Sequence, residues 1–197
     1  MWYQSLLETN VTHQLTNSGI EPRPCRIEMK HPEVDWDRSW SLAVNPGLSS
    51  KHLTFLWRKL HDRLPTQARL FKPHMPNIPS KMCSHCHRDC VGNLSHSLLL
   101  CTYNDGAGQF LIEKLRHHIP NILPQQVVLL DFDVDADLHL PLVFLIAAVL
   151  SDVWECRKEK KPCHLATIRA ALEAGVNILR KSRHKKAAET LALMLDI

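Results

Sequence analysis

Four potential metal ligands lie near the middle of this 197-residue chain and constrain its fold more than any other feature. They are Cys83, Cys86, His96 and Cys101, in the spacing Cys-x2-Cys-x9-His-x4-Cys. Three thiolates and one imidazole form a ligand set that suits tetrahedral zinc. Because four protein ligands leave no coordination position for water, we expect the zinc ion to be structural and not hydrolytic.

The ligand assignment has alternatives within the same loop. Cys90, His85 and His87 could each replace one of the four residues, and Cys90 is the strongest substitute. The chain has seven cysteines, and their clustering favours metal ligation over disulfides in a reducing compartment. The metal-free alternative is a group of buried thiols with a surface histidine.

The residues before the cluster predict two helices and a linker. Apolar residues recur every three or four positions after Ser49, which predicts a capped helix over residues 50–63 that Pro65 ends. Thr66 can cap a second, shorter helix over residues 67–71. Three prolines between residues 73 and 79 then predict an extended linker.

The residues after the cluster also follow a helical period. Asp105 is expected to cap a helix that ends at Pro120, and a shorter piece begins near Pro124. A broadly apolar helix is expected from Pro141 until Pro162 stops it. Two further helical segments are expected, one from Leu165 to Leu179 and a final one that includes Leu191 and Leu195.

These patterns predict a mainly α fold, with helical segments around a small zinc-stapled Cys-Cys-His-Cys loop. Residues 1–47 are expected to be a loosely structured arm, in which Trp36 and Trp40 are spaced for one helical face. Residues 48–104 form a helical segment with the zinc-binding loop. Residues 105–197 form a C-terminal helical region with a basic face.

The basic face follows from an uneven charge distribution. Residues 157–186 hold ten Lys and Arg against two Glu, although the whole chain carries a net charge of only +4. Such a region favours a polyanionic partner, RNA or DNA, although basic helix ends also complement the helix dipole without any partner. The candidate nucleic-acid-binding residues are Arg157, Lys158, Lys160, Lys161, Arg180, Lys181, Arg183, Lys185 and Lys186.

No membrane-spanning segment or secretory signal is expected. The longest apolar run, residues 138–150, is interrupted by His139 and Pro141 and is shorter than the roughly 20 residues that a span needs. The first residues lack a basic n-region and a continuous apolar h-region. An intracellular protein, in the nucleus or the cytoplasm, is therefore expected.

A family resemblance rests on the order of these motifs. Residues 55–66 read FLWRKLHDRLPT and are followed by Arg69-Leu70-Phe71, the Cys-x2-Cys pair and the His-x4-Cys pair. This order resembles the zinc-binding region of reverse transcriptases from non-LTR (LINE-like) retrotransposons. Residues 153–157, VWECR, are similar to the tryptophan and basic residues that follow the cysteine motif in that family. The resemblance spans about residues 36–185.

In that family the segment lies downstream of the polymerase, in the C-terminal part. The resemblance therefore implies a non-catalytic zinc-binding module that binds nucleic acid. Association with a polymerase-bearing protein is a further expectation. The aromatic-x-Asp-Asp motif of the polymerase core is missing, since no two aspartates are adjacent in the chain, so we expect no enzyme activity. The alternative is a structural or protein-interaction module, a retroelement remnant without nucleic-acid binding.

Two aspartate-based hypotheses fail on their own residues. Asp131 and Asp133 superficially resemble the aspartate pair of haloacid-dehalogenase-like phosphatases, but Asp135 stands where that family has Thr or Val. A calcium loop is excluded because Ala136 replaces the turn glycine and Leu142 the bidentate glutamate. These aspartates are expected to form an acidic surface loop.

A cysteine–histidine catalytic pair is also unfavourable. Cys163 and His164 are adjacent in sequence, so in a helix their side chains would diverge by about 100°. Cys156 offers no complete constellation with them. Cys156 and Cys163 are expected to be buried or incidental thiols.

Overall fold

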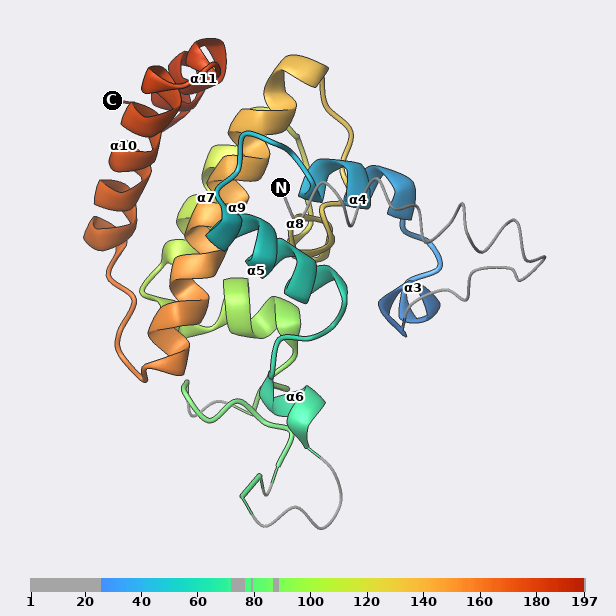
Figure 1. Cartoon of the computed structure of the whole chain (residues 1–197). Helices are drawn as coiled ribbons and strands as arrows, with labels where there is room; N and C mark the ends of the chain where they lie inside the picture. The colour runs from blue at the N-terminus through green and yellow to red at the C-terminus, as the bar shows by residue number, and fades with distance from the viewer. Residues whose placement is uncertain (1–25, 72–76, 79, 87–88, 197) are drawn as a thin grey trace, which may run out of the picture. The chain divides into compact units, whose positions relative to one another are not determined.

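A computed structural model describes residues 26–71, 77–78, 80–86 and 89–196 (Figure 1). The contacts divide the chain into two units, residues 1–32 and residues 33–197. The described part of the first unit contains the short helix α3 (Arg26–Lys30). The helices that follow α3 belong to the second unit.

The second unit confirms the mainly α fold, since its described residues form helices and no strand. The elements in chain order are α4 (Trp36–Ala43), α5 (Ser50–Leu60), α6 (Gln67–Leu70), the π-helix η1 (His96–Leu100), the 3-10 helix η2 (Thr102–Asn104), α7 (Ala107–Arg116), α8 (Pro124–Leu129), α9 (Ala136–Lys158), α10 (Leu165–Lys181) and α11 (Lys185–Leu195).

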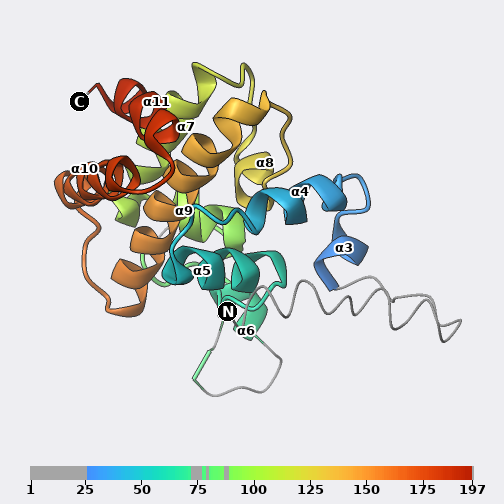
Figure 2. The ribbon, with the colours of Figure 1, turned by 45° about the horizontal axis from the view of Figure 1, so that its top comes forward.

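Helix α9 is the centre of this unit. It contacts α4, α5, α7, α10, α11 and η1, and Figures 1 and 2 show α5 and the α10–α11 pair on different sides of it. Its residues are buried almost without interruption from Pro141 to Val153. A helix that is apolar all round is stable only when neighbours cover every face, which is the arrangement seen here.

The start and the end of α9 correct the sequence prediction. The helix begins at Ala136 and includes Pro141, whereas the sequence pattern predicts a start at Pro141. A proline at this position removes one backbone hydrogen bond near the N-terminus of the helix. Burial of the apolar residues that follow it offsets that loss. The helix ends at Lys158, before Pro162, because Lys160 has a left-handed backbone with φ 55°.

The length of α9 bears on the membrane question. It is the one helix among the described residues that is long and apolar enough to cross a membrane by length and composition. However, 72% of its apolar window is buried inside the structure, as in a core helix. Its hydrophobicity is therefore explained by packing.

Two of the predicted N-caps are confirmed and one is wrong. The Ser49 side chain accepts a hydrogen bond from the His52 backbone N–H, and Thr66 does the same for Arg69. Asp105 does not cap α7: it has a left-handed backbone with φ 47°, and Gly106 with φ 77° precedes the helix. Two successive left-handed residues turn the chain sharply into α7.

Residues 33–47 are more ordered than an arm. They contain α4, whose N-cap Asp35 accepts a hydrogen bond from the Arg38 backbone N–H, and which packs against α5 and α9. Leu42 and Ala43 are buried. The prolines on either side of this short, capped amphipathic helix obscure its period in the sequence. Residues 1–25 of the expected arm lie outside the described residues.

Candidate metal centre

Cys83 and Cys86 lie on a small hairpin. Its two sides are joined by an antiparallel bridge between Met82 and Val91 and by a hydrogen bond of 2.8 Å from the Cys83 backbone N–H to the Cys90 carbonyl. A second bond of 2.9 Å joins the Gly92 N–H to the Lys81 carbonyl. The hairpin is a knuckle that can present two sulfurs to one ion.

His96 and Cys101 come from the π-helix η1 and the residue after it. The Asn93 side chain accepts a 2.8 Å hydrogen bond from the His96 backbone N–H, and the Cys101 N–H donates to the His96 carbonyl at 2.8 Å. In an α-helix, residues five apart lie about 140° apart around the axis. The wider π turn reduces that angle, so the second ligand pair converges because the helix is a π-helix.

The structure brings all four predicted ligands together. One ligand atom from each of Cys83, Cys86, His96 and Cys101 lies within 4.8 Å of the others. The Cys83 and Cys101 sulfurs are 3.8 Å apart, and the Cys86 sulfur is 3.4 Å from His96 Nε2. Tetrahedral zinc with ordinary Zn–S and Zn–N bonds requires S–S separations of about 3.8 Å and S–N separations of about 3.6 Å. The donor set and its spacing therefore fit a zinc ion.

The cluster is largely shielded from solvent. Cys83, His96 and Cys101 are buried, and Cys86 is partly exposed. Burial opposes ionisation of the Cys83 thiol, but backbone N–H groups of His85 and Cys86 and the Arg157 guanidinium more than offset this and lower the pKa of Cys83 to about 5. Burial is the main cause that raises the pKa of Cys101. One sulfur is thus already favoured as the thiolate that a metal binds.

Arg157 belongs to this centre and not to the basic surface. It is only 8% exposed, and its guanidinium lies 3.6 Å from the Cys83 sulfur and 3.4 Å from Asn104 Oδ1. Asn104 in turn donates to the carbonyls of Ser97 and Leu98 in η1. Its assignment as a nucleic-acid contact is therefore corrected, because a side chain buried against thiols is not available to a phosphate.

Two of the alternative ligands, His85 and Cys90, are not in the converging group. The His85 ring contacts Arg157, with Nδ1 3.3 Å from the guanidinium, and its centroid is 5.0 Å from that of Tyr103. Cys90 is not among the four residues whose ligand atoms converge, and it contributes its backbone carbonyl to the knuckle. His87 lies outside the described residues.

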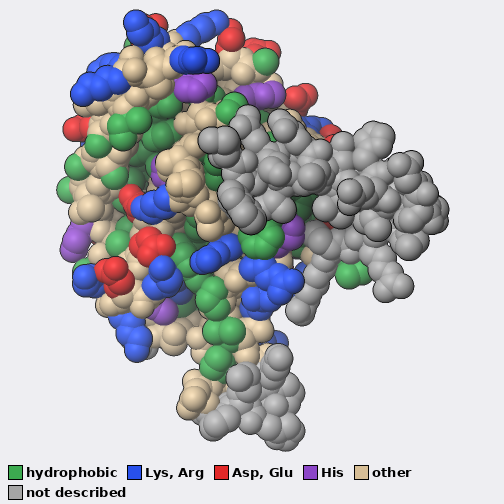
Figure 3. Space-filling view, viewed as in Figure 1, with side chains coloured by type: hydrophobic (Ala, Val, Ile, Leu, Met, Phe, Trp, Pro, Cys, Tyr) green, Lys and Arg blue, Asp and Glu red, His purple; other side chains and the backbone are tan. Residues whose placement is uncertain are grey.

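The other predicted basic residues are all exposed. Arg180, Lys181, Arg183, Lys185 and Lys186 surround the turn between α10 and α11, and Figure 3 shows Lys and Arg side chains gathered at this end of the molecule. Three of the predicted cations have carboxylate partners: Lys158 pairs with Glu155, Lys161 with Glu159 and Lys186 with Asp137. Exposed pairs of this kind are weak and exchange readily with another anion.

The residues behind the enzyme-like alternatives are all described, and they do not form the arrangements that those alternatives require. A phosphatase would need residues 127–130 as a strand before Asp131, but residues 127–129 lie in helix α8 (Pro124–Leu129) and Leu130 is its C-cap. Burial, with a further contribution from Cys156, raises the pKa of Cys163 to about 12, so this thiol stays protonated. His164 is 3.7 Å from Asp105 and exposed. These residues show no activated nucleophile.

Comparison with known proteins agrees with the geometry. Residues 25–107 match the zf-RVT family model, described as zinc-binding in reverse transcriptase, and this range includes α4, α5, the knuckle and η1. No curated protein and no solved structure matches the chain. The match is to the zinc-binding family and not to a polymerase domain. Residues 25–107, with their four converging ligands, are thus similar to the zinc-binding region of reverse transcriptases.

Proposed function

We propose that this protein is a non-catalytic zinc-binding module that binds RNA or DNA and resembles the C-terminal part of a non-LTR retrotransposon reverse transcriptase. The observation that carries the proposal is the convergence of Cys83, Cys86, His96 and Cys101 within 4.8 Å, inside the segment that matches the zinc-binding family. The polymerase motif that would make it an enzyme is missing from the sequence.

Zinc would act here as a cross-link. Bound by the four ligands, the ion would tie the knuckle to η1, and Arg157 would tie both to α9. Structural zinc sites contribute folding free energy directly. The centre would thereby hold the helices in one arrangement, so that their exposed cations form a fixed surface.

Phosphate contacts would come from the exposed cations at the α10–α11 turn and at the end of α9. These residues are Lys158, Lys160, Lys161, Arg180, Lys181, Arg183, Lys185 and Lys186. Their existing ion pairs are all exposed, so replacing a carboxylate by a phosphate costs little. On this proposal the protein works inside the cell, in the nucleus or the cytoplasm, beside a polymerase-bearing protein.

A second candidate function, protein interaction without nucleic acid, has one observation in its favour. Ile178 on α10 and Leu193 on α11 are large apolar residues with exposed fractions of 68% and 79%. Large exposed apolar residues can belong to protein-interaction sites. If the protein-interaction hypothesis holds, replacing both residues by Ser would abolish partner binding. If the nucleic-acid-binding proposal holds, the same change would leave nucleic-acid binding unchanged.

The test is equilibrium binding of labelled single-stranded RNA and DNA at several salt concentrations. Affinity should fall steeply with salt. Changing Arg180, Lys181, Arg183, Lys185 and Lys186 to Gln should flatten the slope by about 0.7 for each single-strand phosphate that the variant no longer neutralises. Arg116→Gln, an exposed cation at the end of α7, is the matched control. A salt-independent affinity, or no binding, would contradict the proposal.

A further inference from the structure

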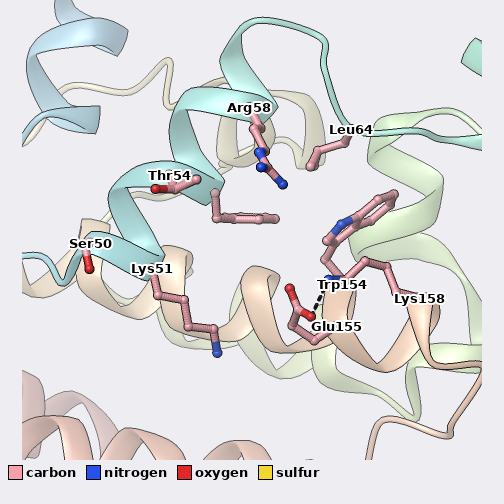
Figure 4. Close-up of a pocket in the computed structure, with 9 residues that line it drawn as sticks. Ser50, Lys51, Thr54, Arg58, Leu64, Trp154, Glu155 and Lys158 are labelled. Atoms are coloured by element: carbon pink, nitrogen blue, oxygen red, sulfur yellow. Dashed lines mark ion pairs between the residues drawn. The ribbon is translucent and has the colours of Figure 1, made fainter. Parts of the chain in front are cut away.

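Two adjoining cavities lie between α5 and α9. Of the predicted nucleic-acid-binding residues, Lys158 lines both. They enclose about 360 and 420 Å³ and share Arg58, Leu64, Trp154 and Lys158 in their walls. Figure 4 shows Arg58, Leu64 and Trp154 directed toward the same space. Each volume is within the range of small-ligand sites, and together they form a groove.

The groove has an aromatic wall and an aromatic floor. Trp154 is only 8% exposed and lines both cavities, whereas Trp57 is 44% exposed and lines the second. The Trp57 ring stacks on His61, with centroids 4.2 Å apart and planes at 28°. A ring already held by a neighbour loses little conformational freedom when a planar ligand stacks against it.

The charges along the groove are predominantly positive. Lys51, Arg58, Arg63 and Lys158 line it against a single carboxylate, Glu155. Lys51 pairs with Asp152 and Lys158 with Glu155. Arg58 and Arg63 are exposed and form no ion pair with any residue that the structure describes. Figure 3 shows Lys and Arg side chains gathered on this face, around the end of α5.

We propose that this groove binds a single-stranded segment of nucleic acid, with one or more bases stacked on Trp57 and phosphates bound by Arg58 and Arg63. The inference rests on the proposed function and gives it a specific surface. Single-strand sites combine cations that follow the backbone with aromatic rings that stack on bases, and this groove has both. A duplex keeps its base faces stacked inside and could use only the cations.

The groove and the metal centre share one structural support. Trp154 forms the groove floor, and Arg157, three residues later on α9, contacts the Cys83 sulfur. Residues three apart on a helix lie on the same side, one turn apart. The contact of the metal centre with Arg157 therefore also stabilises the position of Trp154, the floor of the groove.

The test uses the full chain with a fluorescein-labelled oligouridylate of about 20 nucleotides and the equivalent duplex. Trp57→Ala should raise the dissociation constant for the single strand at least about 5-fold, and Trp57→Phe should retain most of the affinity because a ring remains. Changing Arg58 and Arg63 to Gln should weaken binding of the single strand. It should also lower the slope of log affinity against log salt concentration by about 1.4. Leu193→Ala and Arg116→Gln, exposed residues of comparable kinds outside the groove, should change affinity less than 2-fold.

The outcomes separate this inference from the function on which it rests. Far-UV circular dichroism and zinc content must match wild type for every variant, so that misfolding is excluded. Normal binding by the Trp57 and arginine variants, together with loss of binding in the α10–α11 turn variant, would overturn the groove and leave the function standing. If wild type binds no nucleic acid, both the proposed function and the groove inference are wrong, and a protein partner becomes the alternative occupant of the groove.

Discussion

The guanidinium of Arg157 lies 3.6 Å from the sulfur of Cys83, although 74 residues separate them in the chain. Both side chains are buried, and the Arg157 guanidinium also reaches Asn104 beside η1. Three thiolates around a zinc ion would leave an excess negative charge, which a buried guanidinium at this position would offset. The end of the core helix α9 is thereby part of the candidate metal centre.

Removal of the Arg157 guanidinium should weaken metal binding. Arg157→Leu is expected to lower zinc affinity about 10- to 100-fold, because residues that support metal ligands have effects of this size. Competition with a chelating dye measures the affinity. Lys158→Leu removes a neighbouring charge that is exposed, and it should leave zinc affinity unchanged. Equal affinities for wild type and Arg157→Leu would contradict this role.

The close approach of α7 to η1 depends on Gly108. A Cβ atom at this position would lie 2.0 Å from the Leu99 carbonyl oxygen, which is backbone and cannot rotate away. Gly108→Ala should therefore lower the free energy of unfolding by roughly 2–4 kcal/mol, as overpacking does in its more severe cases. Urea denaturation measures this difference.

Gly106→Ala is the matched control for Gly108. Nothing lies within 4 Å of a Cβ at Gly106, so only its φ of 77° opposes the substitution. The expected cost is about 1 kcal/mol, the cost of a left-handed backbone at a residue other than glycine. If both substitutions cost the same, α7 and η1 have room to separate, and their close approach does not depend on Gly108.

Lys59 is a buried cation that should destabilise the fold at neutral pH. Its side chain is fully buried in α5, and its Nζ has no hydrogen-bond partner among the described residues. Burial lowers the pKa of Lys59 from 10.5 to about 7. Lys59→Met keeps the apolar stem and should raise the free energy of unfolding at pH 7 by roughly 3–5 kcal/mol.

The pH dependence supplies a second measurement on Lys59. Between the folded pKa near 7 and the unfolded pKa near 10.5, the unfolded state binds more protons, so wild-type stability should rise with pH across this window. The difference in free energy of unfolding between Lys59→Met and wild type should narrow over the same pH range and stay constant below it. Lys51→Met, an exposed control, should show no such change. A pH-independent gap would mean that Lys59 reaches solvent.

Metal removal should loosen one part of the fold before the rest. Without zinc, the knuckle depends on one isolated bridge and a few backbone hydrogen bonds, whereas α9, α10 and α11 pack through a continuous apolar core. Chelation should therefore increase amide hydrogen exchange in residues 81–101 first. Simultaneous loss of protection in α9 would instead show that the zinc centre supports the whole unit.

The sequence predicted what depends on neighbours along the chain. The caps at Ser49 and Thr66, the apolar periods and the ligand spacing are local signals, and the structure retains them. The π-turn at His96 could not be predicted, because an α-helical period fits the same residues. Arg157 carries no local sign of burial, since its partners come from residues 83–104. Lys59 and the α5–α9 groove likewise arise only when distant helices pack together.

The most direct test of the account is the zinc content of protein purified without added metal, measured by elemental analysis. Wild type and Cys90→Ser should each contain one zinc per chain, and the Cys83→Ser, Cys86→Ser double variant should contain none. Cys90→Ser is the matched control because Cys90 lies in the same hairpin but outside the four converging ligands. Well-folded wild-type protein without zinc, or loss of zinc in Cys90→Ser, would contradict the assigned centre.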